Sequence, residues 1–304
     1  MPIVRVALKW TGLALGALVG LAAVAALALY FVGGARLYKR YDVAVASIPV
    51  PTDQAAVDRG RHLAEAVTLC HACHGDDLEG SVLFEAPGIA TVYASNLTSG
   101  RGGRTARYRE VDYVRAIRHG INQDGRGLLI MHSDAYNGLG EEDLGALIAY
   151  LGSVPPADKE WPETSVRPLG RILVALGVFD SDVMPLIPAE VVDHEAPIPD
   201  APPQGTTAEY GRYLASIALC STCHGSDFRG GPPVEEGAPP TPNIAVYGMR
   251  GGWSEEQFIG TIRTGVTPYG KVLDAEAMPW EVYAKMTDDE LMAIRRYLAS
   301  MAEG

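Results

Sequence analysis

The sequence predicts an all-α protein with an N-terminal transmembrane helix followed by two small helical domains in tandem. Three observations predict this fold class: a long uncharged apolar run near the N-terminus, an internal repeat, and apolar residues at helical spacing at the end of each copy. Alternation of the kind that indicates strands is scarce. A length of 304 residues also fits about two domains.

Composition excludes some classes of function. The chain has 25 Lys and Arg against 37 Asp and Glu, a formal net charge of −12. Nucleic-acid binding requires a basic surface, so no nucleic-acid partner is expected. With 47% hydrophobic and 20% charged residues, the chain is also unlike disordered proteins.

The first element is the apolar run. No charged residue occurs among the 26 residues from Trp10 to Ala35, and about 20 apolar residues suffice to cross a bilayer. A cleaved signal peptide is the alternative, because Ala26–Ala28 resembles a cleavage site. The run continues to Val32, however, which favours an uncleaved anchor within residues 1–51.

Next come the two repeats, expected over residues 52–155 and 207–304. In each copy a Gly-Arg-x-Leu-Ala segment precedes a Cys-x-x-Cys-His-Gly segment, and an Asn and an Ile-Arg-x-Gly segment follow. The matched positions are Gly60 and Gly211, Cys70 and Cys220, Asn96 and Asn243, and Arg118 and Arg263.

A helix is expected at both ends of each repeat. Helices over 56–70 and 207–220 lead into the cysteines. In the final helix of the first copy, Leu144, Leu147, Ile148 and Leu151 form one apolar face. In the second copy, Thr287 and Glu290 have the spacing of a capping box ahead of Leu291.

The segment between the repeats, residues 156–206, is rich in proline and is expected to be a connector. Within it, Val166–Phe179 is apolar apart from Arg167 and Arg171. We expect a short helix that packs on a domain; lying at the membrane surface is the alternative.

The Cys-x-x-Cys-His motif, present twice, indicates covalent attachment of two haem c groups. Residues i and i+3 share a helix face, so Cys70 and Cys73 can reach one haem edge while His74 turns towards the iron. Cys220, Cys223 and His224 repeat the pattern. A zinc site or a thioredoxin-like pair is the alternative, but neither requires the histidine.

A methionine is expected as the sixth ligand of each iron. Met278 lies 54 residues after His224 and 13 before Leu291, and Met131 lies 57 after His74 and 13 before Leu144. The equal offset favours iron ligation over core packing for both methionines. The competing ligands are His132, His62 and His119 in the first copy and Met249, Met286 and Met292 in the second.

These patterns also carry a family resemblance. It rests on the two Cys-x-x-Cys-His motifs, Asn96–Thr98, Met131, Gly140–Leu144, Pro242–Ile244, Trp253–Phe258, Met278-Pro279 and Thr287–Leu291. Both copies resemble class I cytochrome c domains, above all those of membrane-anchored cytochrome c subunits that serve periplasmic dehydrogenases. The chain departs from that group in having two modules where three are common, and an N-terminal anchor.

The resemblance implies His/Met-ligated haem iron and single-electron transfer between a donor and an acceptor in a respiratory or dehydrogenase-linked chain. The expected partners are a dehydrogenase, an oxidase or a soluble cytochrome, and no catalytic residue is expected. It also implies that the haem domains face the periplasm and that the chain is a single-pass protein of the bacterial cytoplasmic membrane. A dihaem peroxidase with one reactive haem is the alternative function.

Residues 101–118 form a basic cluster of six arginines against two acids. A solvated surface is the simplest interpretation; neutralisation of haem propionates or docking of an acidic partner are the alternatives. Arg118 and Arg263 are the candidate propionate partners.

Overall fold

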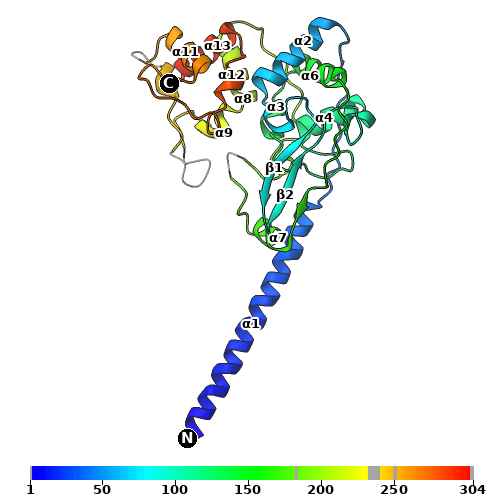
Figure 1. The fold of residues 1–304 in the computed structure, drawn as a ribbon, viewed down its shortest axis with the longest axis vertical. Coiled ribbons are helices and arrows are strands. Elements are labelled where there is room, and N and C mark those ends of the chain that lie inside the picture. The colour runs from blue at the N-terminus through cyan, green and yellow to red at the C-terminus, as the bar shows by residue number, and fades with distance from the viewer. Residues whose placement is uncertain (1, 182–183, 232–239, 249–251, 302–304) are drawn as a thin grey trace.

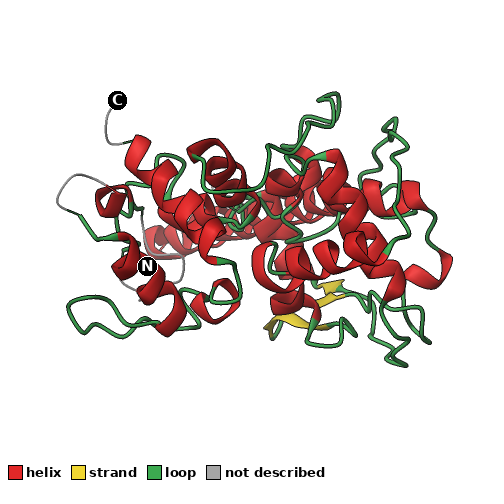
Figure 2. Ribbon diagram, turned by 90° about the horizontal axis from the view of Figure 1, so that it is seen from above, coloured by secondary structure: helices red, strands yellow, loops and turns green. Residues whose placement is uncertain are grey.

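The computed structural model describes residues 2–181, 184–231, 240–248 and 252–301. A long helix, α1 (Pro2–Leu37), projects from a body in which helices predominate (Figures 1 and 2). Ala7–Leu37 of α1 is apolar enough to cross a membrane, with a mean hydropathy of 2.4 and none of its most apolar window buried. A signal sequence would pass the same test.

The two repeats fold alike. The first comprises α2 (Gln54–His62), the π-helical turn η1 (Leu63–Val67), α3 (Cys70–His74), η2 (Thr105–Arg107), α4 (Glu110–His119), α5 (Ser133–Tyr136) and α6 (Glu141–Ser153). The second comprises α8 (Ala208–Ile217), α9 (Cys220–His224), α10 (Ala245–Gly248), α11 (Glu255–Thr264), α12 (Trp280–Tyr283) and α13 (Asp288–Ser300). The predicted capping box of Thr287 and Glu290 begins α13 and is confirmed.

In each repeat the first and last helices cross at a glycine. α2 packs on α6 and α8 packs on α13. A Cβ atom added at Gly60 would lie 1.9 Å from the Ala146 carbonyl oxygen, and one at Gly211 would lie 1.9 Å from that of Ala293. The matched glycines therefore allow the two backbones to approach more closely than any other residue would permit.

The all-α prediction misses a small antiparallel sheet of order β1-β2-β3, formed by two strands of the first repeat and one of the proline-rich segment. Its strands are β1 (Ser81–Ala86), β2 (Ala90–Ala94) and β3 (Ser165–Val166). Pro87 and Gly88 connect β1 to β2, where Gly88 has φ 81° and the Ile89 N–H donates to the Ala86 carbonyl at 3.0 Å. Proline followed by glycine at positive φ is the pattern of a type II turn, so the sequence did contain a signal for this hairpin.

The proline-rich segment packs along the first repeat. The Asn96 side-chain amide donates to the Ala157 carbonyl at 2.8 Å, and Arg118 donates to the Pro197 carbonyl at 3.3 Å. The segment contains α7 (Pro168–Ala175) and η3 (Pro188–Glu190). The predicted short helix over Val166–Phe179 is α7, and it packs on α1 and on the first repeat.

A buried polar network joins the two repeats. In the second repeat, Glu290 lies 2.7 Å from His62 Nε2 and 3.3 Å from Arg59 of the first. In the opposite direction, the Tyr213 hydroxyl donates to Asp143 at 2.7 Å. Arg59 and His62 occupy the positions of Tyr210 and Tyr213, and Asp143 that of Glu290, so the two halves of the network are related by the repeat. One apolar core extends through both repeats around it.

Candidate haem sites

The two Cys-x-x-Cys-His segments have the same unusual backbone. The residue before each first cysteine is a leucine in the left-handed region, with φ 54° at Leu69 and 59° at Leu219. Leu78 and Phe228, eight residues after the first cysteine of each motif, are also left-handed, with φ 55° and 57°. A left-handed non-glycine residue costs about 1–2 kcal/mol. Strain repeated at equivalent positions of both copies marks these segments as functional.

A backbone carbonyl orients each predicted proximal histidine. His74 Nδ1 lies 2.8 Å from the Ser95 carbonyl oxygen, and His224 Nδ1 lies 2.9 Å from that of Pro242. Burial lowers the pKa of both histidines, so the neutral imidazole is favoured. With Nδ1 carrying the proton and donating, Nε2 is the atom left for a metal.

The cysteines do not suit the alternative chemistries. All four are free of disulfide bonds. Burial raises the pKa of Cys70 to about 11 and that of Cys220 to about 12, the opposite of a redox-active thiolate. Among the described residues, no three His, Cys, Asp or Glu side chains gather as a metal site, so a zinc site lacks its ligands.

The two predicted distal methionines lie in matching turns. The Ser133 N–H donates to the Met131 carbonyl at 2.7 Å, and the Trp280 N–H donates to that of Met278 at 2.6 Å. His132 follows Met131 with φ −72° and ψ 48°, and Pro279 follows Met278 with φ −73° and ψ 55°. The first copy thus adopts the turn geometry of the second without a proline.

Two tyrosines that the sequence analysis missed fasten these turns to the attachment segments. Tyr136 donates to the Thr68 carbonyl, and Tyr283 donates to the Ala218 carbonyl at 2.6 Å. Each acceptor lies two residues before the first cysteine of its motif. Each tyrosine lies five residues after its methionine, so the repeat register could have identified the pair.

The matched arginines also hold the methionine segments. Arg118 donates to the Asn137 carbonyl at 3.2 and 3.0 Å, and Arg263 donates to the Ala284 carbonyl. Both acceptors lie six residues after the methionine. These bonds give the two arginines a structural role at the ends of α5 and α12. The hypothesis that they contact haem propionates did not include this role.

Most of the competing ligands have other contacts. His62 is held by Glu290, and His119 Nδ1 lies 3.1 Å from His194 Nδ1. Burial, with the charge of His194, lowers the pKa of His119 to about 4. Met286 is 2% exposed in the apolar core, and Met249 lies outside the described residues.

The residues present fit a haem at each site. Paired thiols on one helical turn, an imidazole oriented through Nδ1 and a methionine in a fixed turn form the donor set of haem c with His/Met ligation. In the second copy the buried Trp280 Nε1–H, next to Met278-Pro279, has no acceptor among the described residues. A bound group that carries acceptor atoms would satisfy it.

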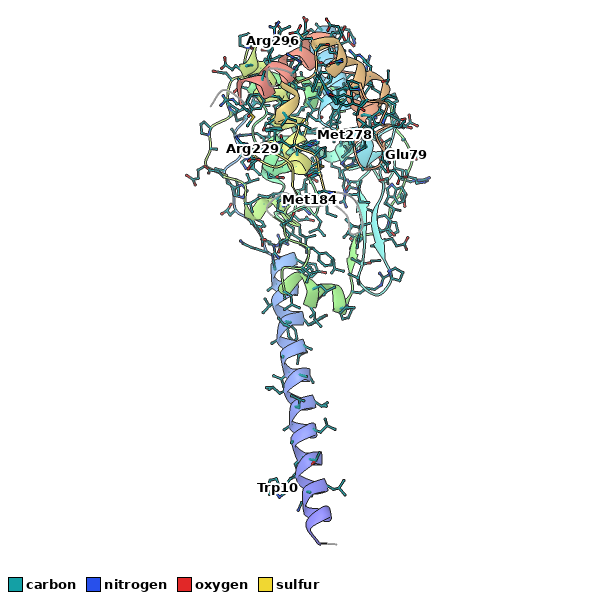
Figure 3. All side chains as sticks on the ribbon, turned by 90° about the vertical axis from the view of Figure 1, so that its left-hand side faces the viewer. Trp10, Glu79, Met184, Arg229, Met278 and Arg296 are labelled. Atoms are coloured by element: carbon teal, nitrogen blue, oxygen red, sulfur yellow. The ribbon has the colours of Figure 1, made fainter. Side chains whose placement is uncertain are left out.

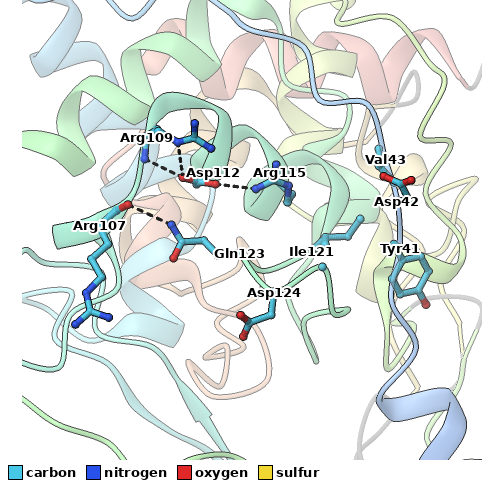
Figure 4. A pocket seen from close by; sticks show the side chains of 11 residues that line it. Tyr41, Asp42, Val43, Arg107, Arg109, Asp112, Arg115, Ile121, Gln123 and Asp124 are labelled. Carbon is cyan, nitrogen blue, oxygen red and sulfur yellow. Dashed lines mark hydrogen bonds and ion pairs between the residues drawn. The ribbon is translucent and has the colours of Figure 1, made fainter.

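The basic cluster lines a surface pocket of about 470 Å³ (Figure 4). Arg107, Arg109 and Arg115 face three acids there, Asp42, Asp112 and Asp124. Asp112 accepts from the Arg115 side chain at 2.7 Å and from the Arg109 N–H at 3.0 Å. Because the pocket's charges balance, it gives no support to docking of an acidic partner.

Family models match both repeats. The cytochrome c model matches residues 57–155. A model of subunit III of cbb3-type cytochrome c oxidase matches residues 207–298.

Curated relatives match across both domains. The chain is 28% identical over 281 residues to the cytochrome c subunit of a quinone-dependent alcohol dehydrogenase of Gluconacetobacter polyoxogenes, covering 82% of this chain and 56% of the relative. It is 28% identical over 273 residues to the fructose dehydrogenase cytochrome subunit of Gluconobacter japonicus, covering 83% and 54%. It is 27% identical over 290 residues to the gluconate 2-dehydrogenase cytochrome c subunit of Pantoea cypripedii, covering 82% and 60%.

The matched part of the chain thus spans little more than half the length of these relatives. All three relatives are cytochrome subunits of dehydrogenases, and two model matches fall on the two repeats that carry the Cys-x-x-Cys-His motifs. The chain therefore contains two cytochrome c domains, and haem c is their cofactor.

Proposed function

We propose that the chain is a membrane-anchored dihaem cytochrome c that carries single electrons from a periplasmic dehydrogenase towards an acceptor of a respiratory chain. Residues 1–51 anchor it to the cytoplasmic membrane with the remainder on the outer face. Residues 52–155 and 207–304 each hold one haem c, and residues 156–206 connect them. The ligands are His74 and Met131 in the first domain and His224 and Met278 in the second.

The observation that carries this proposal is the equivalence of the two sites. Each has a histidine fixed by a carbonyl, a methionine in the same turn, and a tyrosine that ties the turn to the attachment segment. His132 adopts the backbone geometry of Pro279, which favours a closed distal site in the first domain. Two closed sites suit electron transfer and leave little room for a substrate at iron.

Haem c, when bound, supplies a one-electron iron couple. The chain's own residues determine how that couple behaves. The thioether of a methionine favours the reduced state and raises the potential. Hydrogen bonds from His74 and His224 to carbonyls keep each imidazole oriented, and the packed core around the sites limits access of water.

The contact between the domains supports electron exchange between the two sites. Helix α5, which follows Met131, contacts α8 of the second domain. Helix α12, which follows Met278, contacts η1 of the first domain. The segments after both methionines therefore lie at the shared interface. The polar network of Arg59, Asp143, Tyr213 and Glu290 holds this interface in one arrangement.

The relatives supply the argument for the partner. The three compared above are named as cytochrome subunits of dehydrogenases. By this kinship we propose a dehydrogenase as the electron donor and a non-catalytic role for the chain. None of these three relatives is named as a peroxidase, so they give no support to the peroxidase alternative.

Anaerobic reductive titration of the purified full chain tests the proposal. We expect two electrons per chain, rapid reoxidation by a one-electron acceptor and no turnover of peroxide. A variant with Cys70→Ala and Cys73→Ala should take up one electron, because the second site remains intact. High-spin haem with peroxide turnover in the unsubstituted chain would overturn the proposal.

A further inference from the structure

The short helix α7 is fastened to the last turns of α1. A Cβ atom at Gly33 of α1 would lie 1.9 Å from the Arg171 carbonyl oxygen, so the two helices are in close contact. The Arg171 guanidinium lies 4.9 Å from the Tyr30 ring centre and 5.2 Å from that of Tyr38. It donates to both hydroxyls at 3.1 Å. These contacts place α7 beside the end of α1, between Tyr30 and Tyr38, the residue that directly follows the helix.

A second face of α7 packs on the first cytochrome c domain. Gly170 is buried where a Cβ atom would lie 2.4 Å from the Ile89 carbonyl oxygen. Val174 is 3% exposed in an apolar cluster that also contains Leu37 of α1 and Ile121 of the domain. The helix therefore joins the anchor to the domain.

The remaining face of α7 is apolar and exposed. Leu169 and Leu176, the residue that caps the end of α7, are seven residues or two helical turns apart and are 50% and 58% exposed. Ile172 and Leu173, on the same face, are half-buried. Val178, just beyond the helix, is 58% exposed. No polar side chain of α7 lies on this face, because Arg171 points to α1.

The position of this face matches the membrane boundary. The uncharged run Trp10–Ala35 is about 39 Å long at 1.5 Å per residue, more than the roughly 30 Å of a hydrocarbon core. Its last turns therefore reach the headgroup region, where Tyr30 and Phe31 suit an aromatic belt. Figures 1 and 3 place α7 beside α1 at the end of the body from which α1 emerges, and Figure 3 shows Trp10 further along α1 and Arg296 at the opposite end of the molecule.

We propose that the Leu169–Val178 face of α7 lies in the lipid interface of the same bilayer that α1 crosses. This inference rests on the membrane placement of α1 proposed above. Next to Gly33, where α7 packs on α1, the anchor also exposes apolar side chains, Phe31 at 64% and Val32 at 56%. Lys39, exposed two residues after the end of α1, adds a basic group that suits lipid phosphates, whereas Arg40 donates to the Asp124 carbonyl oxygen at 2.9 Å. Since α7 is also packed on the first domain, this contact fixes the tilt of that domain on the membrane.

Spin-label accessibility in the full-length haem-loaded protein tests the proposal. Single variants Leu176→Cys, Leu18→Cys and Val272→Cys are labelled with a nitroxide and reconstituted into vesicles of phosphatidylcholine and phosphatidylglycerol. Relaxation by oxygen reports lipid exposure, and relaxation by a water-soluble nickel chelate reports water exposure. Leu18 is 63% exposed on α1 and Val272 is 70% exposed in the second domain, so they are matched controls for lipid and water.

We expect the ratio of oxygen to nickel relaxation at position 176 to exceed that at 272 several-fold and to approach that at 18. A water-like label at 176 with a lipid-like label at 18 would overturn the inference and leave the anchor intact. A water-like label at 18 would overturn both. The unsubstituted chain should take up no label, because its cysteines are bound to haem; labelling there would contradict the haem assignment itself.

Discussion

Met278 is the side chain on which the redox potential of the second domain should depend most. Its turn is fixed by the Trp280 N–H, and Tyr283 ties the following helix to the attachment segment. Replacing its thioether by an imidazole would favour the oxidised iron.

We therefore predict that Met278→His lowers the potential of one haem by a sizeable share of the roughly 0.8 V that axial ligands span, and leaves the other haem unchanged. Redox titration followed by visible absorbance would measure this. Met292→Leu, on α13, is the control and should change neither potential. If Met278→His left both potentials in place, the sixth ligand of the second haem would be another residue.

His132, which stands where the second copy has Pro279, is the other residue whose substitution tests the iron ligands. His132 has φ −72°, the value that proline imposes, and its backbone N–H has no backbone acceptor within the part of the chain that the structure describes. Proline would therefore fit here without strain.

Accordingly, His132→Pro should keep the first haem six-coordinate and low-spin, with Met131 as ligand. The spectrum of the ferric protein would show this through the weak long-wavelength band of sulfur-ligated haem. Loss of six-coordination in this variant would instead identify His132 as the ligand.

The charge of Arg36, directly after the apolar run, is neutralised by ion pairs within the protein. In the proposed topology, the basic residues that follow the apolar run lie on the outer face, against the usual distribution of charge around a membrane helix. The guanidinium of Arg36 contacts Asp180 at 2.5 Å and Glu190 at 2.6 Å, and these carboxylates hold its pKa above the usual value. In the folded protein this charge is neutralised by the segment that carries α7.

At the scale of elements, the crossing of first and last helices sets the stability of each domain. The Gly211 crossing of α8 and α13 has no room for a methyl group, since the nearest atom is a backbone carbonyl oxygen. Gly260 in α11 has no atom within 4 Å of an added Cβ and is a matched control.

We predict that Gly211→Ala destabilises the second domain by about 1–3 kcal/mol through overpacking. Gly260→Ala should stabilise it by up to about 1 kcal/mol, because alanine favours the helix. Chemical denaturation followed by circular dichroism compares the two. Equal effects of the two variants would contradict the close crossing.

Some features of these elements could be predicted from the sequence and others could not. The terminal helices and the capping box of Thr287 follow from local patterns, and the structure has both. The carbonyls of Ser95 and Pro242 could not be found, because they lie 21 and 18 residues from their histidines in irregular loops. The left-handed conformation of the leucines before the cysteines could not be predicted either, because leucine has no preference for that conformation.

At the scale of the whole molecule, Glu290 links the two domains. Burial alone would raise its pKa, but the hydrogen bond and charge of His62, with Arg59, lower it to about 2. A depressed pKa means that the folded state favours the carboxylate. Its contribution to stability is present above the ordinary value of 4.5 and is lost as pH falls towards 2.

The prediction is that Glu290→Gln is less stable than the unsubstituted chain at pH 7, and that the difference shrinks between about pH 4.5 and 2. Thermal unfolding at a series of pH values measures it. Asp289→Asn, an exposed neighbour in the same helical turn, should show no comparable trend. A stability difference that stayed constant down to pH 2 would contradict the role of the Glu290 charge.

The two matched sites and their shared interface support one central proposal, that the molecule holds two six-coordinate haems with His/Met ligation. The visible and near-infrared spectrum of the ferric full chain, normalised to protein mass, tests this most directly. We expect the sulfur-ligation band at the intensity of two haems per chain, with no high-spin component. A band of one-haem intensity or a high-spin signal would contradict it.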